Sequence, residues 1–159
     1  MSTVVVQAHP LDESYNGALF RRVCSGLSSA GEEFAAVRLG EGESVGPGDL
    51  DGAARVVLVY PTWWGGLPAA LLEWVQTLLA EDALGTVQQV DVVTTHGSSR
   101  LVNFVQGAWG RSYLERRLRA SCAPGCGFSW HALYKIDRCS VAELEHFLTA
   151  TEARFAASP

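Results

Sequence analysis

The chain has 159 residues, of which 48% are hydrophobic and 18% are charged, and its formal net charge is −5. This composition is typical of one compact domain with its own core, and it excludes an intrinsically disordered chain. The acidic balance gives the surface no general attraction for phosphate backbones, so we expect no nucleic-acid partner.

Strands and helices alternate in the first half of the chain. The run TVVVQA (3–8) is continuously apolar and β-branched, which predicts a strand buried on both faces. Residues 18–31 have helical apolar periodicity and end at Gly31, a natural helix stop. The segments 33–39 and 55–60 are predicted as the next two strands, and the more polar 33–39 should lie nearer an edge of the sheet.

The connection between the second and third strands breaks this alternation. Residues 40–54 are rich in glycine and acidic side chains, which disfavours a full crossover helix. Glu41 and Glu43 would also repel a phosphate from the G-x-G sequence at its start. We therefore expect a solvated connection that contains at most a short turn near 49–54.

The alternation resumes in the second half of the chain. A helix is predicted to begin with Pro68 at its first position, where a proline ring fits the helix geometry. The segments 87–95 and 130–136 are predicted strands. Between them, 101–122 contains a helix that is clearest from Arg111 onward.

The chain closes with an amphipathic helix over 140–155. Ser140 is its candidate N-cap, and Glu143 three residues later completes a capping box. Five strands alternating with helices predict an α/β fold, in which helices cover both faces of a doubly wound parallel sheet. We expect a single three-layer domain over 1–159.

The amino-terminal sequence and the apolar runs predict the cellular compartment. The start MSTVVVQAHP lacks a basic segment followed by a long apolar stretch, so it does not predict a secretory signal. No apolar run reaches the roughly 20 residues that a membrane-spanning helix needs. We therefore expect a cytoplasmic protein without membrane insertion.

The four cysteines, Cys24, Cys122, Cys126 and Cys139, are expected to be free thiols. A chain with this much apolar residue needs no disulfide cross-links. Cys122 and Cys126 have the spacing of half a zinc site, but His131 or Cys139 would have to complete it at a poor spacing. We predict no metal.

Three loops form the candidate ligand site. In doubly wound sheets, ligands bind beyond the carboxyl ends of the strands, where the direction of winding reverses. The loops that leave these ends are AHPLDESYNG (8–17), PTWWGG (61–66) and THGSSR (95–100). Each is unusual for a connection that only has to turn.

The first loop meets a helix amino terminus, where unpaired N–H groups and the helix dipole favour an anion. His9, Ser14 and Asn16 can donate hydrogen bonds, so this loop could hold a phosphate. Alternatively, Ser14 or Asn16 is only the N-cap and His9 a satisfied strand-end residue. Asp12 and Glu13 argue against a phosphate unless both point to solvent.

The second and third loops offer an apolar wall and a polar edge. One of Trp63 and Trp64 could plug the end of the core, or the pair could flank an aromatic ligand that the glycines at 65–66 allow close to the backbone. The third loop offers hydroxyls, backbone N–H groups and the His96 imidazole to the polar edge of a heteroaromatic ring. It could equally be a plain turn.

Taken together, the three loops resemble those of the flavodoxin-like NAD(P)H dehydrogenases (quinone reductases) in their short bacterial form. AHP…ESYNGAL is similar to the family's flavin phosphate loop, and YPTWWGGLPAALLEWV to its Pro-x-x-Trp segment. TTHGS is similar to its Thr-Thr-Gly-Gly-Ser loop, and CGFSWHALYKID to its last strand. The resemblance implies a flavodoxin-like sheet of order 2-1-3-4-5 with a reduced helix between strands 2 and 3.

The resemblance also implies an activity, cofactors and site residues. Hydride would pass from NAD(P)H to a flavin and then to a quinone or related aromatic acceptor, while the protein orients the cofactor. The compact chain suits FMN better than FAD, although FAD remains possible, and the family's shared active sites imply a homodimer. The residues carried over are His9, Ser14, Tyr15 and Asn16 for the phosphate and ribityl end, Pro61, Thr62, Trp63, Trp64 and Gly65 along the isoalloxazine, and Thr95, His96, Gly97 and Ser98 at its N1–O2 edge.

Two departures from the family bear on catalysis. His96 replaces the first glycine of the third loop, and 101–111 lacks the family's Tyr, with Trp109 near its His position. In the family, that Tyr and His assist the proton step. We hypothesise that His96 replaces them by donating a hydrogen bond or positive charge to the reduced flavin. The alternative is an exposed loop histidine without a role. We expect Trp64 to border the substrate slot over the flavin ring.

Other functions are compatible with the same fold. A flavodoxin-like electron carrier, a redox-sensing ancillary subunit of a membrane transporter and a tailoring enzyme acting on an aromatic natural product remain alternatives, because fold alone does not separate them.

Overall fold

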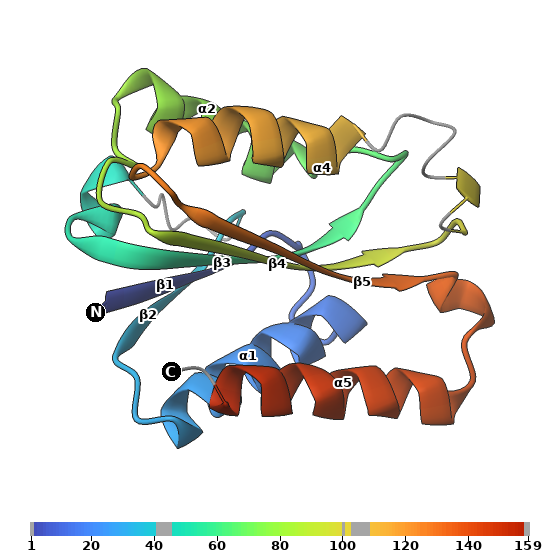
Figure 1. Cartoon of the computed structure of the whole chain (residues 1–159). Helices are drawn as coiled ribbons and strands as arrows, with labels where there is room; N and C mark the ends of the chain where they lie inside the picture. Colours follow the sequence, from blue (N-terminus) through green and yellow to red (C-terminus); the bar gives the residue numbers. More distant parts are fainter. Residues whose placement is uncertain (1, 41–45, 100, 103–108, 158–159) are drawn as a thin grey trace.

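A computed structural model describes residues 2–40, 46–99, 101–102 and 109–157. Five parallel strands form one sheet in the order β2-β1-β3-β4-β5, which confirms the doubly wound topology and the order 2-1-3-4-5 (Figure 1). The strands are β1 (Ser2–Gln7), β2 (Phe34–Arg38), β3 (Ala53–Thr62), β4 (Gln89–His96) and β5 (Gly127–Tyr134).

Helices cover both faces of the sheet, giving the predicted three layers (Figure 1). Helices α1 (Tyr15–Ser29) and α5 (Val141–Ala156) pack together on one face, where Leu19, Val57 and Phe155 belong to one apolar cluster. Helices α2 (Ala69–Ala80) and α4 (Trp109–Tyr113) lie on the other face, which has a larger core of its own. A π-helical turn (η2, Leu114–Leu118) and a 3-10 turn (η3, Arg119–Ser121) continue α4.

Most element boundaries differ from the predicted ones by a few residues. Helix α1 begins at Tyr15 rather than near 18, because Ser14 is its N-cap. Strand β5 begins at Gly127 rather than at 130. Pro68 is the N-cap of α2 and not its first helical residue. The capping box of Ser140 is confirmed.

The polar connection before β3 contains a single short 3-10 turn, η1 (Pro47–Leu50). The expected reduction of this crossover is therefore confirmed for its described part, although the turn lies slightly before the predicted 49–54. Residues 41–45, which carry the two glutamates, lie outside the described residues.

Strand β3 is four residues longer than predicted and includes Pro61. Alternate residues of a strand direct their backbone groups to opposite neighbours, and the carbonyl of Val59 faces β1, where it accepts from Ala8 N at 3.0 Å. Pro61 has the same parity, so it faces the side on which β1 has already ended at Gln7. Its missing N–H therefore costs the sheet no hydrogen bond.

All four cysteines are free thiols, as expected. Cys126 precedes β5 and Cys139 follows it, so the eight-residue strand keeps them about 25 Å apart and they cannot share a metal. Among the described residues, no three His, Cys, Asp or Glu side chains gather in one place. None of the helices described is both long and apolar enough to cross a bilayer.

Candidate functional site

The carboxyl edge of the sheet between β1 and β3 is the place where a doubly wound fold has its ligand crevice. This is the point where the winding reverses, since β2 lies on one side of β1 whereas β3 to β5 follow on the other. The pairing of β1 with β3 stops at Gln7 and Val59, but β3 continues to Thr62. The three candidate loops leave this edge, so the structure brings the predicted segments together.

The first loop is folded tightly against the start of α1. Ser14 Oγ accepts from Gly17 N at 3.0 Å, as a helix N-cap does. A side chain on Gly17 would collide with the carbonyl oxygen of Asp12, so this loop can reach α1 only over a glycine. His9 Nδ1 lies 3.0 Å from the backbone nitrogen of Leu11, and its ring meets that of Trp63 edge-on at 6.2 Å.

The acidic residues of this loop do not oppose an anion at the helix. Asp12 pairs with Arg38 at 2.6 Å and lies 3.8 Å from Arg21, which offsets its charge. Glu13 is exposed. The first turn of α1 contains no acidic residue, and no acceptor is recorded among the described residues for the backbone N–H groups of Tyr15 and Asn16. This is the arrangement that favours a bound anion.

The side chains of Tyr15 and Asn16 point elsewhere. The Tyr15 hydroxyl donates to Leu144 O on α5 at 2.8 Å, and burial raises its pKa to about 12. The Tyr15 hydroxyl is therefore engaged within the protein, and the backbone N–H of Tyr15 is its candidate group for a phosphate. Asn16 is buried, and its Nδ2 donates to Thr95 Oγ1 at 3.1 Å, which joins the first loop to the end of β4.

The second loop is a tight turn that projects a tryptophan into solvent. Gly66 N donates to Trp63 O at 2.9 Å, and Trp64 and Gly65 between them have φ angles of 52° and 74°. Positive φ at both central residues defines a type I′ turn. Trp64 is 104% exposed and Trp63 is 46% exposed, so neither ring plugs the core.

Helix α4 packs against this turn. Gly110 N donates to Gly65 O at 3.2 Å. A side chain on Gly110 would come within 3.3 Å of Leu67, so the helix approaches the turn closely because it has a glycine there. The Trp109 ring lies beside Gly66 and stacks on Tyr113 with centroids 5.1 Å apart. Trp109 therefore lies at the same edge of the sheet as Trp63 and Trp64.

His96 is the last residue of β4 and is only 5% exposed, so it is not an exposed loop histidine. Its ring stacks on that of Tyr134, the residue paired with it on β5, at 4.5 Å and an interplanar angle of 9°. On the same edge, Thr62 Oγ1 lies 3.0 Å from Thr94 Oγ1. Two neighbouring strands thus set the position of the imidazole.

The rest of the third loop is held by the chain after β5. Ser98 O accepts from Lys135 N at 3.1 Å. A side chain on Gly97 would come within 3.0 Å of the Asp137 carboxylate, so the backbone at 97 lies open on one side and against this carboxylate on the other. Arg100 lies outside the described residues.

Exposed apolar side chains mark the same edge. Every large apolar residue that is exposed in the described part of the chain lies in a segment that leads from the carboxyl end of a strand to the next helix, or at that helix's start. These residues, the carboxyl-edge rim, are Leu11, Trp63, Trp64, Leu101, Val102, Trp109 and Val141. Exposed apolar side chains that gather at one edge of a sheet are a feature of surfaces that meet a ligand or a partner.

Several residues of this edge were not identified from the sequence. Gly17 was quoted in the motif, but only the close contact with Asp12 gives the reason for a glycine. The pairing of His96 with Tyr134 depends on strand register, and that of Asp12 with Arg38 on the order of β2 and β1. Sequence periodicity alone predicts neither of these two pairings.

Comparison with known proteins identifies a family. A family model described as the flavodoxin-like fold matches residues 1–88, which is more than half of the chain. No curated protein sequence matches the chain significantly.

Solved structures share the fold at low sequence identity. Smu.1420 from Streptococcus mutans superimposes with a TM-score of 0.84 at 16% identity, covering 99% of this chain and 100% of its own. An NAD(P)H:quinone oxidoreductase from Methanothermobacter marburgensis has a TM-score of 0.77 at 18% identity, covering 98% and 96%. An FMN-dependent NADH-azoreductase from Bacillus anthracis, solved with FMN, has a TM-score of 0.72 at 10% identity, covering 98% and 97%. At these identities the likeness establishes the fold.

Proposed function

Because the chain belongs to the flavodoxin-like fold family, we propose that it binds FMN at the carboxyl edge of the sheet and acts as an NAD(P)H oxidoreductase. In this role two electrons pass as a hydride from NAD(P)H through the flavin to a quinone or related aromatic acceptor. The observation that carries the proposal is the carboxyl-edge rim, in which a fully exposed Trp64 stands on a strained turn beside the reversal point of the sheet.

The first loop has the chemistry that a flavin phosphate requires. The open N–H groups of Tyr15 and Asn16 and the positive end of the α1 dipole attract the anion. The ring of His9 and the hydroxyl of Ser14 lie on the same loop and complete the set of donors. Asn16, through its bond to Thr95, holds this loop against the segment that would meet the isoalloxazine.

The second and third loops have the chemistry that the flavin ring requires. When bound, FMN supplies the ring that accepts and returns the hydride. Pro61, Thr62, Trp63 and Gly65 offer backbone along one side of the crevice, and the Trp64 ring offers a flat apolar surface on which an aromatic acceptor can stack. Excluding water from this surface would strengthen the polar contacts beneath it.

The end of β4 would meet the polar edge of the flavin. Thr95, Gly97 and Ser98 offer backbone and hydroxyl groups there, and His96 can donate a hydrogen bond from a fixed ring position. A donor that is held in place before the reaction stabilises developing negative charge without reorganisation. His96 is therefore the proposed catalytic residue, and Trp64 the proposed acceptor-binding one.

A homodimer is part of the same proposal. The carboxyl-edge rim exposes several large apolar side chains around the crevice, and a second subunit would cover them and complete the acceptor pocket. FMN is proposed over FAD because the described edge offers one phosphate position, at α1. The cytoplasmic location expected from the sequence stays a prediction.

The test begins with the colour of the purified protein. We expect a flavin spectrum, FMN as the released cofactor, and oxidation of NADH or NADPH that accelerates when a quinone is added. A colourless protein that does not bind added FMN would contradict the proposal. Slow NAD(P)H oxidation combined with fast one-electron exchange would indicate an electron carrier instead.

A further inference from the structure

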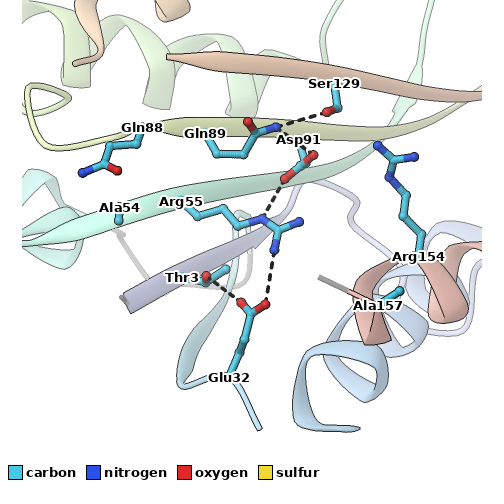
Figure 2. Close-up of a pocket in the computed structure, with 10 residues that line it drawn as sticks. All are labelled: Thr3, Glu32, Ala54, Arg55, Gln88, Gln89, Asp91, Ser129, Arg154 and Ala157. Atoms are coloured by element: carbon cyan, nitrogen blue, oxygen red, sulfur yellow. Dashed lines mark hydrogen bonds and ion pairs between the residues drawn. The ribbon is translucent and has the colours of Figure 1, made fainter. Parts of the chain in front are cut away.

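A cavity lies at the edge of the sheet opposite the candidate site, beside the amino ends of the strands. It has a volume of about 660 Å³, within the range of roughly 300–1,000 Å³ that small-molecule sites occupy. The sheet forms its floor and the last turn of α5 forms part of its wall (Figure 2). Its lining residues are Thr3, Glu32, Ala54, Arg55, Gln88, Gln89, Asp91, Ser129, Arg154 and Ala157.

The floor of this cavity is polar where a covered parallel sheet is normally apolar. Thr3, Arg55 and Gln89 are paired in register across three adjacent strands. Asp91 and Ser129 are paired in the same way one step further along β4 and β5. Asp91 is 2% exposed, which is unusual for a carboxylate and requires compensating partners.

Hydrogen bonds join these groups into a continuous network (Figure 2). Arg55 Nε donates to Asp91 Oδ2 at 2.7 Å, and Arg55 is also 3.5 Å from Glu32. Gln89 Nε2 donates to Asp91 Oδ1 at 3.1 Å and to Ser129 Oγ at 3.1 Å. Both oxygens of Asp91 are therefore occupied, and Arg55 is shared between two carboxylates, Asp91 and Glu32.

Near β5, some hydrogen-bond donors are not used by this network. The Arg154 side chain extends from α5 toward the strands that carry Asp91 and Ser129 (Figure 2), and no ion pair or hydrogen bond within the described residues occupies it. The Ser129 hydroxyl accepts from Gln89, so its own proton is available. Two residues further along β5, His131 Nε2 is buried and has no hydrogen-bond partner in the described part of the chain.

Arg154 and Ser129 line the same cavity and can therefore act on one ligand. His131 is not among the lining residues, but it lies two residues from Ser129 on β5, so its signals can report on a ligand bound there. Arg55 is already engaged by Asp91 and Glu32, whereas Arg154 has no ion pair to the described residues. A guanidinium and a hydroxyl are suited to a carboxylate or phosphate, which can accept several hydrogen bonds at once.

We propose that this cavity is a second ligand site, in which Arg154 and Ser129 bind the carboxylate or phosphate group of a small polar molecule. It does not depend on the proposed flavin chemistry. The eight residues of β4 separate Gln89 at this site from His96 at the other edge, a distance of about 23 Å, so both sites can be filled together.

The test is an NMR titration of FMN-saturated protein with inorganic phosphate and, separately, with acetate. One equivalent of FMN, with unbound FMN removed by gel filtration, occupies the phosphate position at α1, so signals from this cavity can be read alone. We expect saturable shifts of the Ser129 and His131 signals, and binding about tenfold weaker in Arg154→Gln. A preference for phosphate would indicate a phosphorylated ligand, and a preference for acetate a carboxylic acid.

Arg117→Gln is the matched control. Arg117 is also exposed but lies on η2, which packs on the other face of the sheet, so its loss should leave both titrations unchanged. Ser129→Ala should weaken binding without removing a charge. Shifts that do not saturate, or that persist unchanged in Arg154→Gln, would overturn the site. Failure to take up FMN is read from absorbance and bears only on the proposed function.

Discussion

Trp64 occupies a backbone conformation that is unfavourable for a tryptophan. The central residues of a type I′ turn are usually Asn, Asp or Gly, and a bulky residue at φ 52° costs of order 1–3 kcal/mol. Full exposure means that burial of the ring returns nothing to the stability of the isolated chain. Strain without a folding benefit is what the proposed binding role of the indole would explain.

Replacing Trp64 should therefore separate stability from function. Trp64→Gly should raise the free energy of unfolding by about 1 kcal/mol, because glycine accepts positive φ. Trp64→Ala should leave stability within about 0.5 kcal/mol. Both should raise the KM for an aromatic acceptor or loosen flavin retention, measured by steady-state kinetics and fluorescence. Lower stability with intact kinetics would return Trp64 to a role in packing.

Gly17 is the residue whose replacement should damage the first loop most directly. In Gly17→Ala the new methyl group would meet the Asp12 carbonyl, so the loop or the start of α1 must move. We expect a loss of about 1–3 kcal/mol in urea unfolding together with weaker FMN binding. Gly85→Ala is the control, since no atom lies within 4 Å of the added methyl group there. Equal behaviour of the two variants would contradict the close contact.

His96 offers a second test at a single position. His96→Ala should change the flavin reduction potential and lower turnover, because the donor at the end of β4 is lost. Tyr134→Ala leaves the imidazole but removes its stacking partner, so it should produce a smaller change in the same direction. Flavin reduction potentials of both variants, measured by dye equilibration, would show the size of each change. An unchanged potential with unchanged turnover in His96→Ala would end the proposed role.

At the scale of elements, α1 and α5 are joined through Glu152. This carboxylate accepts from Ser25 Oγ at 2.6 Å and pairs with Arg22 at 2.5 Å. The helices can come this close because a side chain on Gly26 would lie only 2.5 Å from the Glu152 carbonyl oxygen. The hydrogen bonds from Ser25 and Arg22 lower the pKa of Glu152.

A lowered carboxylate pKa gives a definite direction of pH dependence. The contribution of Glu152 is present above its unfolded-state pKa of 4.5 and is lost as the pH falls through the lower, folded-state pKa. Stability should therefore fall with acid in urea unfolding at a series of pH values from 6 downward. Glu152→Gln should reduce this slope. Glu73→Gln, an exposed residue of α2 with no ion pair to the described residues, should not.

The elements were more predictable from the sequence than their ends. Apolar runs and helical periodicity identified the strands and α5, because burial imposes those patterns. The end of β3 was missed because a proline is usually read as a strand breaker, and only the early end of β1 makes Pro61 acceptable. The predicted helix 101–122 is only partly described, and from Leu114 it changes to π and 3-10 geometry that periodicity does not resolve.

At the scale of the whole molecule, filling the crevice should stabilise the fold. A ligand at about 100 times its dissociation constant adds roughly 2.7 kcal/mol, which for a chain of this size is about 5–10 °C in melting temperature. We expect FMN to produce this shift in calorimetry. Riboflavin, which lacks the phosphate that α1 would bind, should produce a smaller one. Equal shifts would argue against the phosphate position.

The location of the candidate site was predictable, whereas its internal geometry was not. Doubly wound topology brings the three loops to one edge whatever their side chains do. The direction of the Tyr15 side chain depends on how α5 packs, and the stacking of His96 on Tyr134 depends on the register of β4 and β5. The polar cavity at the opposite edge arises from residues of several strands, connections and the end of α5, which come together only in the folded sheet.

The distribution of the tryptophans gives this protein an intrinsic optical reporter. Trp63, Trp64 and Trp109 are exposed around the crevice, whereas Trp74 and Trp130 pack in or against the core. A water-soluble quencher should therefore reduce the fluorescence of the three exposed tryptophans more than that of the two packed ones. A molecule that enters the crevice would shield the emitters at its rim, so occupancy of the crevice could be followed without any attached label.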